Sequence, residues 1–175
     1  RIADLNATPL VVGETLYVAA YNGDLAALDL TSGAVLWRRA LSSYAGLTEA
    51  DGTLYVTDSN DLVWAAKPED GAGLWKQEAM RYRDLSAPAV MGETVLVGDL
   101  EGYVHLLARN DGRILGRQRV AKGGIQAQPL VAGGRVFVLG ADGTLAALSL
   151  GAVSPATTKS PTPMPTATKT PTPAF

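Results

Sequence analysis

The sequence predicts an all-β protein built from β-propeller blades, and three observations support this prediction. A motif of about forty residues occurs four times, its copies contain short strand-like segments, and turn residues separate these segments. Hydrophobic residues make up 47% of the 175 residues, charged residues only 18%, and glycine occurs 19 times. Glycine spread through an apolar chain is typical of many short strands and tight turns. Helical spacing explains none of this pattern.

The four copies align on one apolar position in the second strand-like segment. Taking Leu16, Leu54, Val95 and Val136 as equivalent gives spacings of 38, 41 and 41 residues, the differences between their numbers. Leucine-rich and hexapeptide solenoids have shorter periods, whereas a propeller blade has this length. We therefore expect blades over residues 1–153, with repeats at about 7–44, 45–84, 85–125 and 126–150.

Each complete copy is expected to form four antiparallel strands, which in the first copy span about residues 8–12, 15–20, 25–30 and 35–40. The pairs Asn22-Gly23 and Asp142-Gly143 suit two-residue hairpins, whose central residues need positive φ. The segment 16–20 is apolar throughout, as expected for a strand covered on both faces. No fourth strand is evident after Leu150, so the last blade is expected to be incomplete.

A spaced motif indicates how neighbouring blades pack. The Gly-His and Trp-Asp pairs of WD40 repeats are absent. The first copy carries a different set of residues: Ala27, Asp29, Gly33 and Trp37. This set resembles the tryptophan-docking motif of the quinoprotein (PQQ-like) propeller families. The tryptophan is expected to pack between blades, and the glycine to allow the chain to turn.

The docking motif weakens along the chain. The second copy keeps three of its four positions, with Lys67 in place of the aspartate: Ala65, Gly71 and Trp75. The third copy keeps only Gly112, and Gly116 occupies the tryptophan position. The motif therefore predicts architecture, but it predicts no chemistry.

Three longer stretches, residues 4–9, 20–33 and 98–105, carry a closer resemblance. The run from Gly98 to His105, Gly-Asp-x-Glu-Gly-Tyr-x-His, is the most specific of them. Together they resemble BamB, the outer-membrane protein assembly factor family of Gram-negative bacteria. The resemblance covers about residues 1–150 and corresponds to the C-terminal part of an eight-bladed PQQ-like propeller.

The resemblance implies a noncatalytic scaffold at the periplasmic face of the outer membrane. Members of this family are lipoproteins that bind the POTRA domains of BamA, assist barrel insertion, and are candidates to bind nascent outer-membrane protein strands. The family's Asp-x-Asp docking pair matches Asp4, Leu5 and Asn6, where Asn6 would replace a charge-assisted bond by a neutral one. The family's Leu-x-Leu-Arg docking stretch and its lipid-bearing cysteine have no match in this chain. Because the chain begins with Arg1, we expect the natural N-terminus and its lipid anchor to lie upstream.

The remaining polar residues give no catalytic set. His105 is the only histidine and there is no cysteine, so packing or a local hydrogen bond is expected for His105. The pairs Gly123-Gly124 and Gly133-Gly134 read as turns, because no phosphate-loop ending follows them. Five aspartates are expected to cap their own turns: Asp24, Asp58, Asp61, Asp111 and Asp142. We expect no catalytic residue, no cofactor and no metal site.

Charge and hydropathy exclude further classes. The formal net charge of -2 provides no field for nucleic acid, and no apolar run is long enough for a membrane-spanning helix. One basic cluster could be a solvated face or an anion-binding patch: Arg109, Arg113, Arg117, Arg119 and Lys122.

Residues 154–175 differ in composition from the rest of the chain. They contain six of the ten prolines and seven threonines. Such a segment cannot bury enough apolar surface to order itself, so we expect it to be disordered or extended. It motivates one alternative function, a surface or sensor ectodomain on a Pro/Thr-rich stalk. A quinoprotein dehydrogenase is the other alternative, although the cysteines of its ring-stacking disulfide are missing.

Overall fold

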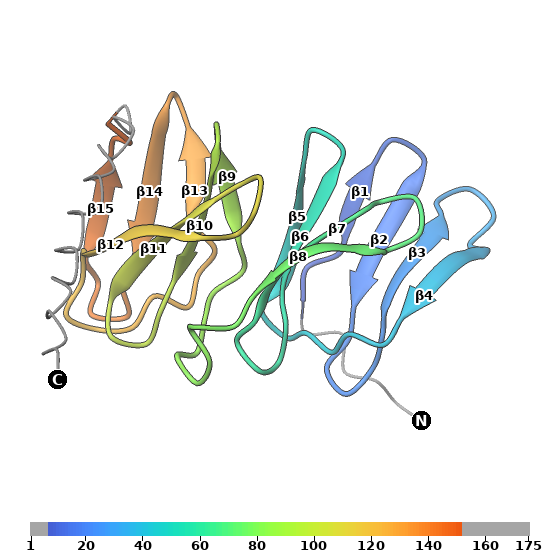
Figure 1. Ribbon diagram of the computed structural model, residues 1–175, viewed down its shortest axis with the longest axis horizontal. Helices are drawn as coiled ribbons and strands as arrows, with labels where there is room; N and C mark the ends of the chain where they lie inside the picture. The colour runs from blue at the N-terminus through green and yellow to red at the C-terminus, as the bar shows by residue number, and fades with distance from the viewer. Residues whose placement is uncertain (1–6, 152–175) are drawn as a thin grey trace, which may run out of the picture.

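The computed structural model describes residues 7–151, which form four separate antiparallel sheets arranged side by side in an open arc (Figure 1). Strand is the only regular secondary structure in this range, so it contains no helix that could cross a membrane. The predicted fold class, an all-β partial propeller with an incomplete last blade, is confirmed. The Pro/Thr-rich segment predicted to be disordered lies outside the described residues.

The four sheets follow one another along the chain and are numbered here as blades. Blade 1 contains β1 (Leu10–Val12), β2 (Thr15–Ala19), β3 (Leu25–Asp29) and β4 (Val35–Arg39). Blade 2 contains β5 (Gly46–Ala50), β6 (Thr53–Thr57), β7 (Val63–Ala66) and β8 (Gly73–Gln77). Blade 3 contains β9 (Ala89–Met91), β10 (Thr94–Gly98), β11 (Tyr103–Ala108) and β12 (Ile114–Arg119). Blade 4 contains β13 (Leu130–Ala132), β14 (Arg135–Leu139) and β15 (Leu145–Leu148).

The first strand of each blade lies at the inner side of the arc. β1 contacts β5, β5 contacts β9, and β9 contacts β13, so these strands form a continuous inner wall. β1 begins at Leu10 and not at the expected residue 8, because Pro9 has no amide hydrogen to donate to a ladder. Its pairing with β2 is therefore only three residues long, from Leu10↔Tyr17 to Val12↔Thr15.

Strand register shows that the four copies are structurally equivalent. The alignment residues of the second strands pair with the third strands in the same way: Leu16↔Leu28, Leu54↔Ala66, Val95↔Leu107 and Val136↔Leu148. In blades 1 to 3 the ladder between the third and fourth strands shifts just before this third-strand partner. A residue in one blade can therefore be matched to its counterpart in another by counting from these pairs.

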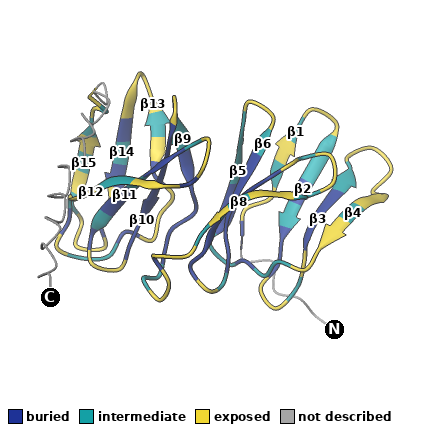
Figure 2. Ribbon diagram, in the orientation of Figure 1, coloured by how far each residue is buried: buried dark blue, intermediate teal, exposed yellow. Residues whose placement is uncertain are grey.

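Three apolar cores lie between the blades, one at each contact. Leu54 and Val56 of blade 2 are fully buried in a cluster with Tyr17 and Leu25 of blade 1. The next two contacts repeat the arrangement with equivalent positions of blades 2 and 3, and then of blades 3 and 4. Buried residues accordingly concentrate in the middle strands, while β4 and much of β8 are exposed (Figure 2).

Tryptophan docking links blade 1 to blade 2. The indole Nε1 of Trp37 donates a hydrogen bond of 2.8 Å to the carbonyl oxygen of Pro68. The ring lies against Gly71, where an added Cβ would come within 2.7 Å of it, and beside Tyr17 at a centroid distance of 6.1 Å. Gly71 therefore has to lack a side chain for the indole to reach its acceptor.

The contact between blades 2 and 3 has the same geometry. Trp75 Nε1 donates a bond of 2.8 Å to the carbonyl oxygen of Arg109, and its ring lies 6.0 Å from that of Tyr55. An added Cβ at Gly112 would come within 2.4 Å of this indole. At Gly33, the counterpart of Gly71 and Gly112 in blade 1, no atom of the described residues lies within 4 Å of the ideal Cβ.

Asp29 shapes the turn that carries this glycine. Its Oδ1 accepts bonds of 2.7 Å from both the amide and the hydroxyl of Ser32, and these bonds lower the pKa of Asp29 below its ordinary value. The Gly33 amide bonds back to the Asp29 carbonyl, as the Gly71 amide does to Lys67 in blade 2. The main-chain bond therefore persists where lysine replaces the aspartate.

We expect Trp37→Ala to lower the free energy of unfolding by about 3 kcal/mol, because the substitution leaves a cavity in the contact between blades 1 and 2. Trp37→Phe keeps much of the packing but loses the bond to Pro68, so it should cost about 1 kcal/mol. Urea denaturation of both variants measures these differences. Equal losses for the two variants would contradict the packing role.

Candidate protein-binding surface

The predicted docking residues Asp4, Leu5 and Asn6 lie outside the described residues, but the repeat identifies their counterparts. Asn6 stands four residues before Leu10, which pairs with Tyr17. The same count from Thr48, Ala89 and Leu130, which pair equivalently, leads to the counterparts in blades 2 to 4: Tyr44, Leu85 and Gln126. These residues lie in the loops before β5, β9 and β13, along the lower edge of the view in Figure 1. We call this edge the loop edge.

The three counterparts come together in space. Tyr44, Leu85 and Gln126 line one cavity of about 240 Å³, together with Ala45 and Asp84. Residues at the same repeat position in blades 2, 3 and 4 therefore form one continuous surface at the inner side of the arc.

This cavity carries negative charge. Tyr44 donates a hydrogen bond of 3.3 Å to Asp84 Oδ1, and Asp61 accepts the amides of Asp84 and Leu85 at 3.0 and 2.8 Å. Burial, followed by the charges of Asp61 and Asp84, raises the pKa of Tyr44 to about 12. Within residues 7–151, no lysine, arginine or histidine forms an ion pair with either carboxylate. Asp61 is buried, so the partly exposed Asp84 is the carboxylate that a basic group of another molecule could reach.

The loop before β9 presents an exposed tyrosine in a strained conformation. Tyr82 has φ of 63° and is 83% exposed, and Asp84 also has positive φ. Such angles are uncommon for residues with side chains, and they persist where the surroundings impose them. Arg83 supplies that constraint, with bonds of 2.6 and 2.8 Å to Asp99 and one of 2.7 Å to Glu101.

A pair of contacting tyrosines also lies on the loop edge. Tyr21, in the loop between β2 and β3, contacts Tyr44 edge to face at a centroid distance of 6.0 Å and an interplanar angle of 73°. Tyrosine offers an apolar ring and a polar hydroxyl, and it is enriched in protein interfaces. Tyrosines on a held backbone beside a negative cavity are suited to binding another protein.

Asp99 links the loop before β9 to the hairpin between β10 and β11 through several hydrogen bonds. Its Oδ1 accepts the amides of Glu101 and Tyr103, both at 2.9 Å, and its Oδ2 accepts His105 Nε2 at 2.7 Å as well as Arg83. His105 is buried and makes the local hydrogen bond that the sequence analysis expected. Burial alone would raise the pKa of Asp99, but the bonds from His105, Tyr103, Arg83 and Glu101 together hold it below its ordinary value.

Blade 2 contains the same arrangement with a different partner. Asp58 Oδ1 accepts the amides of Asn60 and Leu62 at 2.8 and 3.0 Å, and Oδ2 accepts Trp64 Nε1 at 2.8 Å. In both of these blades the aspartate precedes its side-chain donor by six residues. This spacing is visible in the sequence and could have identified the network.

The expected turn-capping role is seen for Asp58, Asp111 and Asp142, whereas Asp61 instead accepts the amides of the distant Asp84 and Leu85. Asp111 and Asp142 cap turns by accepting backbone amides two residues on, and Asp142 also accepts the Lys122 amide. Within the described range, no group of histidine, aspartate and glutamate side chains could hold a metal ion.

The predicted basic cluster does not form one patch. Arg109 binds Asp51, Tyr55 and the Ala50 carbonyl between blades 2 and 3. Arg117 and Arg119 instead stack near the Tyr103 ring, at 4.7 and 5.8 Å from its centroid.

The fold defines the chain as a section of a β-propeller built from PQQ-like repeats. The family model described as outer membrane protein assembly factor BamB matches residues 1–77 and 65–153. The chain belongs to this family. Relatives named outer membrane protein assembly factor BamB include that of Pseudomonas aeruginosa, 45% identical over 150 residues, which are 86% of this chain and 40% of the relative. The one from Escherichia coli is 37% identical over 145 residues, 83% of this chain and 37% of the relative.

Solved structures agree with this assignment. The crystal structure of BamB from Moraxella catarrhalis matches with a TM-score of 0.78 and 32% identity, over 85% of this chain and 45% of that one. Quinohemoprotein alcohol dehydrogenase from Comamonas testosteroni matches with a TM-score of 0.64 but 17% identity, over 78% of this chain and 29% of that one, and so shares the fold. The chain spans about two fifths of the length of the relatives it matches.

We expect Asp99→Asn to destabilise the protein by roughly 3 kcal/mol at neutral pH, because it leaves the buried His105 and the partly buried Arg83 facing an amide. The folded-state pKa of Asp99 is depressed, so its contribution is fully present above its unfolded value of about 3.9 and is lost as the pH falls through the folded value. Urea denaturation of both proteins between pH 7 and 3 measures the difference, which should shrink below about pH 4. A difference that does not change with pH would contradict the charge-based role.

Proposed function

We propose that this chain is part of a noncatalytic scaffold of the outer-membrane β-barrel assembly machinery, which binds the POTRA domains of BamA and assists insertion of outer-membrane proteins. Membership in the BamB family supports this role, since its named members are outer membrane protein assembly factors. In the full-length protein the scaffold would face the periplasm as an outer-membrane lipoprotein.

The loop edge supports the proposed docking of BamA. The observation that carries the proposal is the convergence of Tyr44, Leu85 and Gln126, the counterparts of Asn6, on one cavity. The predicted docking pair would then extend a surface that already carries the carboxylate of Asp84 and exposed tyrosines. Proteins recognise one another through such central aromatic groups with charges that steer the encounter.

A second candidate is a surface or sensor ectodomain of PQQ-like repeats, favoured by the composition of residues 154–175. Both functions use the blades for binding and neither needs a catalytic set. They differ in the partner, because only the assembly scaffold requires affinity for POTRA domains. Oxidation of a substrate that depends on added pyrroloquinoline quinone would instead support the dehydrogenase alternative.

Binding of the purified chain to the POTRA domains of BamA, measured by biolayer interferometry, tests the proposal. We expect Asp4→Arg to weaken binding by roughly 2–5 kcal/mol, the cost of removing one partner of a buried charge pair. Tyr82→Ala should also weaken it, because the substitution removes an exposed aromatic anchor.

Asp111→Arg is the matched control, since it makes the same charge change in the β11–β12 turn, at the opposite edge of the propeller from the loop edge. It should leave the affinity unchanged. Absence of binding by the unsubstituted chain, or equal effects of Asp4→Arg and Asp111→Arg, would overturn the proposed docking surface.

A further inference from the structure

Each contact between complete blades contains a slot for one tryptophan. The slot is bounded by the second strand of the blade that donates the tryptophan and by the end of the third strand of the next blade. Trp37 fills the first slot beside Tyr17, and Trp75 fills the second beside Tyr55. In both slots the indole N–H donates to a backbone carbonyl, that of Pro68 or Arg109. Each acceptor stands two residues after the third-strand residue that pairs with the alignment residue of its blade.

The third slot, between blades 3 and 4, lacks both aromatic rings. Leu106 pairs with Gly116 as Ala27 pairs with Trp37, so glycine stands at the tryptophan position. Leu96 pairs with Ala89 as Tyr17 pairs with Leu10, so leucine stands at the tyrosine position. Among residues 7–151, no atom lies within 4 Å of an added Cβ at Gly116, so the described part of the chain leaves this side of the slot open.

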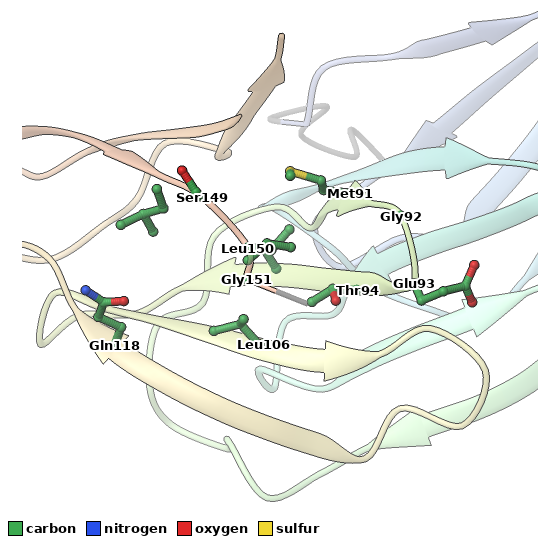
Figure 3. Close-up of a pocket in the computed structure, with 11 residues that line it drawn as sticks. Met91, Gly92, Glu93, Thr94, Leu106, Gln118, Ser149, Leu150 and Gly151 are labelled. Carbon is green, nitrogen blue, oxygen red and sulfur yellow. The ribbon is translucent and has the colours of Figure 1, made fainter. Parts of the chain in front are cut away.

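A cavity of about 710 Å³ occupies this position (Figure 3). Its apolar lining comes from both blades and includes Met91, Leu96, Leu106, Leu148 and Leu150. Leu150 is the counterpart of Pro68 and Arg109, because it stands two residues after the register partner Leu148. The slot thus keeps the main-chain position whose carbonyl accepts an indole N–H in the other two slots.

We propose that this empty slot binds an aromatic side chain, above all an indole, carried by an extended segment of an outer-membrane protein client. This inference rests on the proposed function. The other two slots show which side chain this geometry accommodates, and the cavity is of the size of small-ligand sites. Strands of outer-membrane barrels alternate apolar and polar residues and carry aromatic girdles, so an unfolded client offers such side chains in extended segments.

The client ring would pack between Leu96 and Leu106 of blade 3 and Leu148 of blade 4. Its N–H would donate to the carbonyl of Leu150, and the flanking residues of the client would lie along the outer strand β12. A slot that binds one aromatic ring suits transient binding of many client sequences, because it contacts the ring and makes no demand on the neighbouring side chains.

The test uses the whole chain and a capped pentapeptide of alanine and valine with a central tryptophan, with binding followed by NMR titration. The peptide should shift resonances of Leu96, Leu106 and Leu150. A peptide with central alanine should bind at least about tenfold more weakly, since burial of one large apolar side chain supplies the affinity.

Gly116→Trp should fill the slot from within, raise the unfolding temperature and reduce peptide affinity at least about tenfold. Arg117→Trp is the matched control, because the next residue of a strand points to the opposite face. If Gly116→Trp fails to fold, Leu106→Phe narrows the same slot and should also weaken binding.

Several outcomes would overturn the inference: equal binding of the two peptides, unchanged binding by both slot variants, or no binding by the unsubstituted chain. The last result would mean that the slot is too narrow, or that residues after Gly151 or a second copy of the chain cover it. Gly116→Trp should leave affinity for POTRA domains unchanged. If the unsubstituted chain binds the peptide but not the POTRA domains, the proposed scaffold role is rejected and the aromatic-binding slot is retained.

Discussion

The packing of a tryptophan from one blade onto the glycine turn of the next is the interaction on which the rest of the structure depends. A single blade has apolar side chains on both faces of its sheet, so it cannot bury them without neighbours. The indole of Trp37 fixes the spacing and tilt between blades 1 and 2, because its hydrogen bond to Pro68 and its contact with Gly71 must both be satisfied. The inter-blade cores then close over Leu54 and Val56.

The fixed packing of the blades also determines where the loop edge lies. The loops before β5, β9 and β13 follow strands whose positions are already set by blade packing, so equivalent residues of different blades converge on one cavity. Asp58 and Asp99 each tie the hairpin of their own blade through two amides and one side chain. In blade 3 this hairpin also holds Arg83, and through it the strained backbone of Tyr82.

Most of the fold could be predicted from sequence because its signals are local and repeated. The period of Leu16, Leu54, Val95 and Val136 and the paired turn residues identify the blades without tertiary information. The loop edge could not be predicted in the same way. The bonds from Asp61 to the amides of Asp84 and Leu85 join residues more than twenty positions apart, and the positive φ of Tyr82 has no glycine to indicate it. The empty slot was visible only as the missing tryptophan at Gly116, since its volume depends on blade 4 as well.

The docking of tryptophan onto glycine also makes the series of blades directional. Blades 1 and 2 each give an indole to the blade that follows, and blade 2 also receives one from blade 1, so the two ends of such a run of blades are chemically different. Blade 1 shows the receiving end, where Gly33 has open space above it and Leu30 occupies the acceptor position of Pro68 and Arg109. A further blade at this end would pack in the same orientation as the others, with its outer strand facing the glycine turn of blade 1. A run of blades therefore has a direction, and each contact between a tryptophan and a glycine turn defines it.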